Sequence, residues 1–152
     1  MSASSLIKLK ICSLNCQGLN DFYKRASLFE WLKSTDFHII LLQETKLKPE
    51  CEKKYMTEWG SMGSIFNSVV GGKSGTAILL NRSNIDFSLG SKLIDVEGKV
   101  ISVDVDILQC QVHVVNSYGP NESKNKIPFL NRMHLYLDSN LPIVGLIDFL
   151  QD

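Results

Sequence analysis

The rest of the chain is organised around FHIILLQET, residues Phe37–Thr45. Its middle, Ile39–Leu42, is a run of large apolar residues, which predicts a strand that is buried on both faces. The run ends abruptly in the polar residues Gln43 and Glu44. A carboxylate without a partner at the end of a buried strand is costly. Three explanations stay open for Glu44: a metal ion, a structural salt bridge, or an exit of the chain into a solvated loop.

The composition is that of one globular domain. Of the 152 residues, 44% are hydrophobic and 21% are charged, with no sign of disorder. The 16 Lys and Arg residues balance the 16 Asp and Glu residues, so the formal net charge is zero. This balance argues against a general polyanion-binding surface, although a local basic strip is compatible with it.

The four cysteines indicate a reducing compartment. Cys12, Cys16, Cys51 and Cys110 form no CxxC pair and have no zinc-site spacing. We interpret them as reduced thiols of an intracellular protein, in the nucleus or the cytoplasm. The N-terminal residues contain too short an apolar run for a signal peptide, and no apolar stretch is long enough to span a bilayer. We therefore expect no membrane association.

Hydrophobic periodicity predicts a mixture of strands and helices. Strands are expected at Leu6–Leu14, Phe37–Thr45, Ser64–Val70, Thr76–Leu80, Phe87–Ile94, Lys99–Ile107, Gln111–Tyr118 and Leu141–Leu150. Helices are expected from Asp21 to about Lys33, from Pro49 to about Trp59, and from Pro128 to about Asp138. The order indicates an α/β protein with a mixed sheet and hairpins, because strands and helices do not alternate strictly.

The cleanest alternation in the sequence is KVISVDVDI, residues Lys99–Ile107. Its Val and Ile residues are expected to face the core, while Asp104 and Asp106 face outward. The next strand places Asn116 and Tyr118 on the same face as Val112 and Val114.

Polar residues stand at or just beyond the ends of several predicted strands. Asn15 and Glu44 each end a strand, and Tyr118 and Asn121 lie at the end of another. Strand ends along one edge of a sheet are where α/β proteins place their sites. Amide and carboxylate oxygens suit a hard cation such as Mg²⁺. Taken one at a time, the same residue types are also common in turns and helix caps.

Five short sequence motifs occur in one fixed order along the chain. They are SLNCQGL at Ser13–Leu19, LLQETKL at Leu41–Leu47, SGTAILL at Ser74–Leu80, GKVISVDV at Gly98–Val105 and VNSYGPN at Val115–Asn121. In these motifs the sequence resembles the endonuclease/exonuclease/phosphatase superfamily, most closely the apurinic-type endonuclease domain at the start of LINE-type retrotransposon polyproteins. The resemblance implies the N-terminal portion of a four-layer α/β/β/α sandwich of the DNase I type.

The resemblance also implies an activity and the residues that carry it. The activity is Mg²⁺-dependent hydrolysis of a DNA phosphodiester, with Mn²⁺ as a substitute ion. The implied residues are Asn15 and Glu44 for the metal, Tyr118, Asn121 and Asp148 for catalysis, and Asn15, Asn116 and Lys73 for the substrate. For Lys73, a solvated turn is the alternative interpretation.

The sequence departs from the family near its end. After Ile143–Gly145 the family continues with Gly-Asp-Phe-Asn, whereas here Asp148 fits only if one residue is inserted, and Leu150 stands where Asn is expected. The closing Ser-Asp-His word of the family is absent. His38, His113 and His134 match no catalytic position, and we expect them on the surfaces of strands or helices.

These departures lead us to expect that residues 1–152 are a single, truncated domain without its C-terminal half. Such a chain would be inactive, with weak or lost DNA binding. Missing strands would leave apolar sheet surface exposed, through which copies could self-associate. Two alternatives stay open: a phosphodiesterase or phosphatase of the same superfamily acting on RNA or lipid, and a non-enzymatic, decayed remnant.

Overall fold

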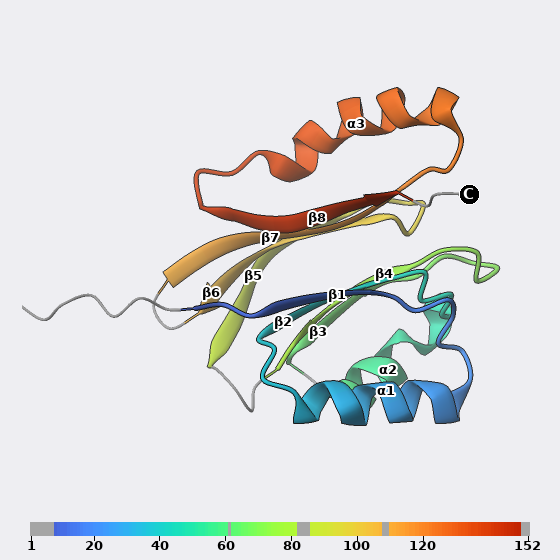
Figure 1. Cartoon of the computed structure of the whole chain (residues 1–152), viewed down its shortest axis with the longest axis vertical. Coiled ribbons are helices and arrows are strands. Elements are labelled where there is room, and N and C mark those ends of the chain that lie inside the picture. Colours follow the sequence, from blue (N-terminus) through green and yellow to red (C-terminus); the bar gives the residue numbers. More distant parts are fainter. Residues whose placement is uncertain (1–7, 61, 82–85, 108–109, 150–152) are drawn as a thin grey trace, which may run out of the picture.

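Two four-stranded sheets pack face to face, with helices on both outer sides (Figure 1). The computed structural model describes residues 8–60, 62–81, 86–107 and 110–149. Residues 148 and 149 are described by their backbone alone. The elements in chain order are β1 (Ile11–Asn15), α1 (Phe22–Ser34), β2 (Ile39–Gln43), the 3₁₀ turn η1 (Pro49–Cys51), α2 (Glu52–Trp59), β3 (Ser64–Asn67), β4 (Thr76–Leu80), β5 (Phe87–Ile94), β6 (Val100–Ile107), β7 (Cys110–Gly119), α3 (Ser123–Leu137) and β8 (Ile143–Phe149). This arrangement confirms the predicted fold class.

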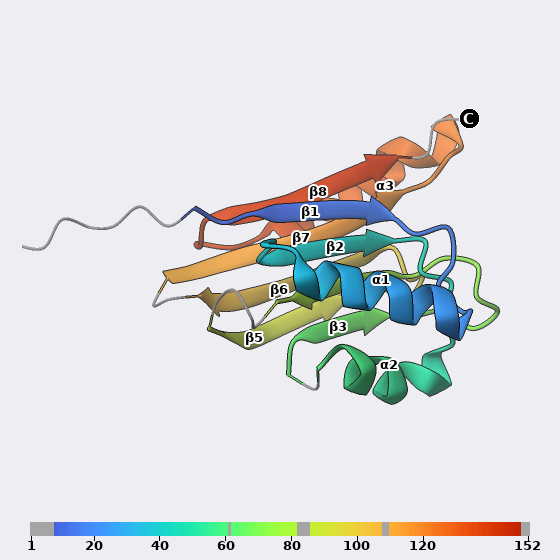
Figure 2. The ribbon, with the colours of Figure 1, turned by 60° about the horizontal axis from the view of Figure 1, so that its bottom comes forward.

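The strand order brings two parallel pairs to the same edge of the sandwich. The first sheet has the order β1-β2-β4-β3, and β1 runs parallel to β2 with Asn15 opposite Gln43. The second sheet has the order β5-β6-β7-β8, and β7 runs parallel to β8 with Tyr118 opposite Asp148. Figure 2 shows the β1 and β8 arrows pointing the same way. Their carboxyl ends therefore form a common rim.

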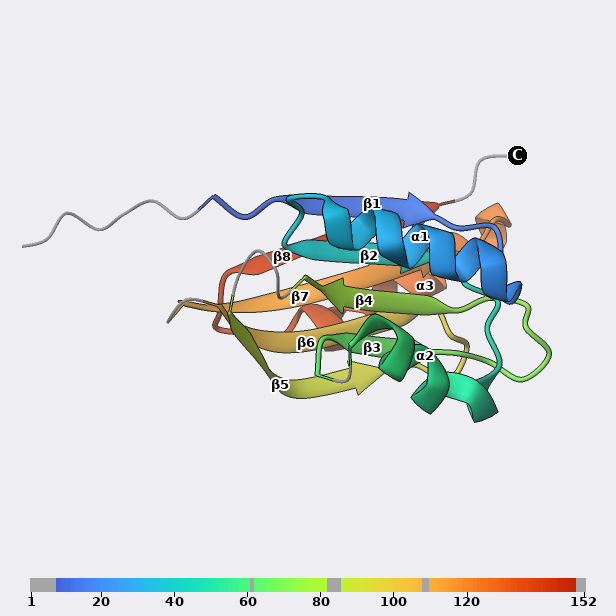
Figure 3. The same cartoon turned by 90° about the horizontal axis from the view of Figure 1, so that it is seen from below.

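Strand β2 lies between two hydrophobic cores, as predicted. Ile39 and Leu41 belong to the core between the two sheets, while Ile40 and Leu42 belong to the core under the helices. Figure 3 shows α1 and α2 lying across the first sheet. Because every residue of β2 is buried, the strand is fixed on both faces up to its last residue.

The predicted alternation in the second sheet is also confirmed. The inward-facing residues of β6 and β7 pack against the first sheet: Ile101, Val103, Val105, Ile107, Val112 and Val114. Helix α3 covers part of the opposite face, where Phe129 and Met133 pack on Val100 and Val115.

The first two helices begin where the sequence predicts. Asp21 caps α1, since its carboxylate accepts a hydrogen bond of 2.9 Å from the backbone N–H of Lys24. Pro49 opens the short turn that continues into α2. Other predicted boundaries shift by a few residues, and the predicted strand ends at Leu6 and Leu150 lie outside the described residues.

The predicted start of the last helix is wrong. Helix α3 begins at Ser123, and Pro128 lies inside it. A proline ring holds φ near the helical value while it removes one hydrogen-bond donor. Proline therefore signals helical backbone at this position without marking the first residue of the helix.

The expected surface position of His113 is also wrong. Its side chain is 7% exposed, because α3 covers the outer face of β7. The ring atom Nδ1 lies 2.8 Å from Oδ1 of Asp104, and Nε2 lies 2.5 Å from the backbone oxygen of Tyr136. Asp104 does face outward, as predicted, and the histidine links it to the helix.

Apolar residues are exposed along one side of the sandwich. In the described chain β1 and β8 are each one of the two end strands of their sheets, and Figures 2 and 3 place them on the same side. Ile11 in β1 is exposed, and so are Ile143 and Ile147 in β8, which lie beside His113 and Ser117 in the register of the second sheet.

No helix within the described ranges is both long enough and apolar enough to cross a membrane.

Gly75 allows the chain beside β2 to pack closely. Its φ is +125°, and its backbone oxygen accepts a hydrogen bond of 3.1 Å from the N–H of Thr45. A Cβ atom at this position would lie 2.3 Å from the Thr45 side-chain oxygen. The segment that follows β2 thus depends on a residue without a side chain.

We predict that Gly75→Ala destabilises the protein more than Gly71→Ala. Gly71 has a φ of +91° and nothing near its missing Cβ, so alanine there carries only the left-handed backbone cost of about 1–2 kcal/mol. Alanine at Gly75 adds a steric clash of about 1–3 kcal/mol. Urea unfolding of both variants measures the difference, and equal losses would contradict the packing argument.

Candidate active site

Glu44 and Tyr118 meet at the rim, although they come from different sheets. Glu44 follows β2 directly and adopts a φ of +53°, and Tyr118 is a buried residue near the end of β7. The Tyr118 hydroxyl donates a hydrogen bond of 2.9 Å to Oε1 of Glu44. In the described part of the chain Glu44 forms no ion pair. The salt-bridge explanation for this carboxylate therefore finds no support.

Asn15 lies on the same edge, at the end of β1, which pairs with β2, the strand that Glu44 follows. Its side-chain oxygen accepts a hydrogen bond of 3.1 Å from the N–H of Gln17, which turns the chain away from β1. The N–H of Cys16 then donates to the oxygen of Gln43, and the N–H of Gly18 donates to the oxygen of Glu44, both at 2.8 Å. The loop after β1 is thus bound directly to the residues that end β2.

A buried amide joins the two sheets just behind this rim. The Asn116 side chain is 0% exposed, and its Nδ2 donates to the backbone oxygens of Leu42 at 2.9 Å and Ala77 at 2.8 Å. Its Oδ1 accepts a hydrogen bond of 3.0 Å from Nε2 of Gln43. Asn116 is thus enclosed and hydrogen-bonded within the interface between the sheets, and its expected role at the substrate stays a prediction.

Gln43 is the partner that the sequence analysis missed. It is buried, and its Nε2 also donates to the Ser13 hydroxyl at 3.0 Å. Strict alternation along β2 puts Gln43 on the same face as Ile39 and Leu41. A polar residue at an inward position of a buried strand needs a partner, and this signal was present in the sequence.

The remaining predicted residues lie near the rim without joining the Glu44–Tyr118 pair. Asn121 is exposed between β7 and α3, and Lys73 is exposed in the turn between β3 and β4. The backbone of Asp148 pairs with Tyr118 across β7 and β8, and its side chain lies outside the described part. In the described structure no hydrogen bond connects Asn121 or Lys73 to Glu44 or Tyr118.

A cavity of about 600 Å³ adjoins the loops at the rim. Lys46 and Lys48, which follow Glu44 in the chain, line it together with Gly18 and the glycine turn before β4. Asp21 and Glu50 line it as well. The two lysines are balanced by two carboxylates, so the lining carries no strong net charge.

Cys16 is not a nucleophile of the site, although it follows Asn15. Burial raises the pKa of the Cys16 thiol to about 12, and the nearby ammonium of Lys24 opposes this shift only in part. The thiol is therefore protonated near neutral pH, when only the thiolate reacts.

The rim fits a hard divalent cation that keeps most of its water. One oxygen of Glu44 is held by Tyr118, and the other has no hydrogen-bond partner among the described residues. The described chain contains no group of three or more His, Cys, Asp and Glu residues that could hold a metal ion. This donor set does not fit a zinc site. Mg²⁺ is commonly bound by one or two carboxylates, waters and substrate phosphate, which the rim can accommodate.

Residues 12–137 match the profile of the Endonuclease/Exonuclease/phosphatase family, which is most of the chain. The chain belongs to this family. The match includes Asn15, Glu44 and Tyr118 and ends at the last residue of α3. The Glu44–Tyr118 pair and Asn15 on the same edge thus lie in the part of the chain that defines membership.

Relatives of this family member include nucleases that act on DNA. The chain is 29% identical over 116 residues to a DNA-(apurinic or apyrimidinic site) endonuclease of Dictyostelium discoideum, covering 75% of this chain and 31% of that protein. It is 29% identical over 151 residues to the DNA repair nuclease APEX1 of Danio rerio, covering 91% and 44%. The chain therefore spans less than half the length of these curated relatives.

A solved AP endonuclease from Archaeoglobus fulgidus has the same fold. It superimposes with a TM-score of 0.59 at 20% identity, over 91% of this chain and 56% of the other. At this identity the likeness concerns the fold alone.

We predict that Asn116→Ala lowers the free energy of unfolding by about 3 kcal/mol or more. The substitution removes three buried hydrogen bonds, to Leu42, Ala77 and Gln43, at about 1 kcal/mol each. The exposed Asn131 provides the control, because Asn131→Ala should cost less than about 0.5 kcal/mol. Urea unfolding measures both, and a small loss at Asn116 would show that the tie is dispensable.

Proposed function

We propose that the chain is the N-terminal part of a Mg²⁺-dependent endonuclease domain that hydrolyses phosphodiester bonds in DNA. The observation that carries the proposal is the hydrogen bond between Tyr118 and Glu44 at the rim. It joins a carboxylate that can bind a cation to a phenol that can face a phosphate. Similarity to DNA endonucleases supports DNA as the substrate over RNA or lipid.

Each residue of the rim has a proposed part in this reaction. Glu44 and Asn15 would hold Mg²⁺, or Mn²⁺ in its place. The bound ion supplies charge stabilisation at the phosphate and the leaving oxygen. Tyr118 holds the Glu44 carboxylate in one orientation and would contact the phosphate beside it. Asn121 would donate hydrogen bonds to the phosphate from its amide, and Lys73 would contact the DNA backbone.

The water that attacks the phosphate needs a base, and Asp148 is the proposed one. Its backbone pairs with Tyr118 in β8. The residues around it depart from the family's Gly-Asp-Phe-Asn word. Without a positioned base, a loss of about 10²–10⁴-fold in rate is expected. We therefore propose that this chain by itself is inactive and binds DNA weakly.

The open side of the sandwich supports the proposal that the domain is incomplete. Apolar residues of the end strands β1 and β8 are exposed, and the chain spans less than half of its curated relatives. We propose that copies of this chain self-associate through this side.

We also propose that the chain derives from a LINE-type retrotransposon and is an intracellular protein.

We predict that the chain binds Mn²⁺ and that Glu44→Gln weakens this binding by about tenfold or more, because a neutral amide replaces the carboxylate ligand. The free Mn²⁺ signal in electron paramagnetic resonance measures the affinity. Glu30→Gln is the control, since Glu30 is exposed on α1 away from the rim.

The same variants decide whether the chain cuts DNA. Supercoiled plasmid is incubated with Mg²⁺ and either the unaltered chain or Glu44→Gln. Because we propose that the chain is inactive, the two should give the same amount of nicked plasmid. Nicking that disappears in Glu44→Gln and persists in Glu30→Gln would refute the proposed inactivity. Equal Mn²⁺ affinity in the unaltered chain and in Glu44→Gln would refute the proposed metal site.

A further inference from the structure

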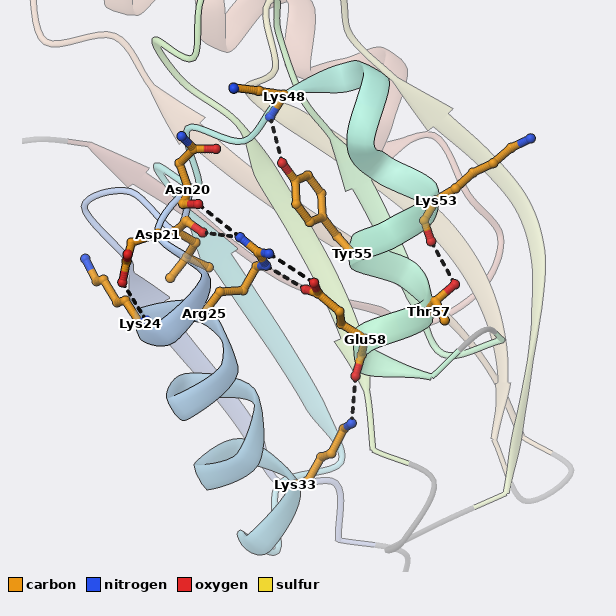
Figure 4. Close-up of polar contacts among 11 residues, drawn as sticks. Asn20, Asp21, Lys24, Arg25, Lys33, Lys48, Lys53, Tyr55, Thr57 and Glu58 are labelled. Carbon is orange, nitrogen blue, oxygen red and sulfur yellow. Dashed lines mark hydrogen bonds and ion pairs between the residues drawn. The ribbon is translucent and has the colours of Figure 1, made fainter.

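Arg25 is a charged residue that is almost completely enclosed. It lies in the first turn of α1, and its side chain is 2% exposed. Its Nε and Nη2 donate to the two carboxylate oxygens of Glu58 in α2, at 2.6 and 3.0 Å (Figure 4). The guanidinium also lies over the Tyr55 ring, 4.6 Å from its centre. This forked pair fixes the two helices to each other.

The third guanidinium nitrogen of Arg25, Nη1, contacts the loop before α1 and not α2. It donates to the backbone oxygens of Leu19 at 2.9 Å and Asn20 at 3.2 Å, in the loop between β1 and α1 (Figure 4). The neighbouring residue Lys24 binds the start of this loop, with its Nζ 2.9 Å from the oxygen of Cys16. Two adjacent basic residues of α1 therefore hold the carbonyl groups of Cys16, Leu19 and Asn20 on the helix side.

The N–H groups of the same loop face the end of β2. Gly18 donates to the oxygen of Glu44 at 2.8 Å, and Leu19 donates to the oxygen of Thr45 at 2.7 Å. Gln17 and Glu44 both adopt a left-handed backbone, with φ of +51° and +53°. Such conformations are costly and persist only where the surroundings impose them.

Helix α2 also contacts the segment that follows Glu44. The Tyr55 hydroxyl accepts a hydrogen bond of 3.4 Å from the N–H of Lys48 (Figure 4). Tyr55 thus contacts the segment after Glu44 directly, whereas Glu58 reaches the loop of residues 16–20 only through Arg25. The hydrogen bonds between Arg25 and Glu58 lower the pKa of the Glu58 carboxyl.

We propose that Arg25 is a positioning residue of the candidate active site. It holds the loop of residues 16–20 against the end of β2 and thereby fixes the backbone at Glu44. The effect on metal binding rests on the proposed function. A purely structural ion pair between α1 and α2 requires Glu58 alone, whereas Arg25 also binds two loop carbonyls. A lysine has one nitrogen and cannot make both sets of contacts.

The test is Arg25→Lys, which keeps the positive charge and removes the fork. Amide hydrogen exchange under native conditions should show protection at Gly18 and Leu19 falling about tenfold more than protection at Leu41 in the middle of β2. The Mn²⁺ affinity of the folded variant should fall by about threefold or more, because Glu44 is less well ordered.

Leu32→Ala is the matched control, because Leu32 is a fully buried residue of the same helix whose side chain packs in the core under the first sheet. It should lower protection at Gly18, Leu19 and Leu41 by the same factor and leave the Mn²⁺ affinity unchanged. If Arg25→Lys does not fold, Glu58→Gln replaces it, because it weakens the support of Arg25 and should give the same pattern.

The outcomes separate this proposal from the proposed function. Equal losses of protection in the loop and in β2, with unchanged Mn²⁺ affinity, would overturn the role of Arg25. A selective loss of protection in the loop supports it. If the unaltered chain binds no Mn²⁺, the proposed function fails, while a selective loss at Gly18 and Leu19 still supports Arg25 as the residue that positions the loop.

Discussion

The side-chain amide of Asn116 spans the interior between the two sheets, and the geometry of the rim depends on it. It binds the backbone of β2 and β4 and the side chain of Gln43, all within the buried interface. An apolar interface sets the spacing of sheets loosely, since it is not directional. Hydrogen bonds of fixed length and direction set it sharply. Glu44 follows Gln43 in sequence, and Tyr118 lies two residues beyond Asn116, so the pairing behind the rim determines the pairing at the rim.

The same rim is held from outside by charge. Arg25 and Lys24 bind the carbonyls of one loop, while the N–H groups of that loop bind the end of β2. From the interior to the rim, the apolar core is followed by the buried Asn116 amide and then by the half-exposed Glu44 carboxylate. This gradient keeps Glu44 accessible to ions while its backbone is fixed, which is the preorganisation that a site requires. The family match and the DNA-acting relatives are consistent with such a site.

Much of the fold could be predicted because periodicity encodes burial directly. The apolar run of β2 indicated two buried faces, and the alternation in β6 indicated which residues pack inward. The positions of Asn116 and Arg25 could not be found this way. Asn116 meets residues about 40 and 74 positions away in sequence, which no local pattern records. An arginine in a first helical turn is ordinarily exposed, and only the placement of α2 encloses it. His113 was misjudged for the same reason, since its burial depends on where α3 lies.

A crystal structure of the chain grown with Mn²⁺ shows whether Glu44 and Asn15 hold a metal ion beside Tyr118. We expect one anomalous peak in contact with the Glu44 carboxylate on the Asn15 side of the rim. We also expect the Tyr118 hydroxyl to remain within hydrogen-bond distance of Glu44. A peak elsewhere on the protein, or side chains of Glu44 and Tyr118 that point to different regions, would contradict the account.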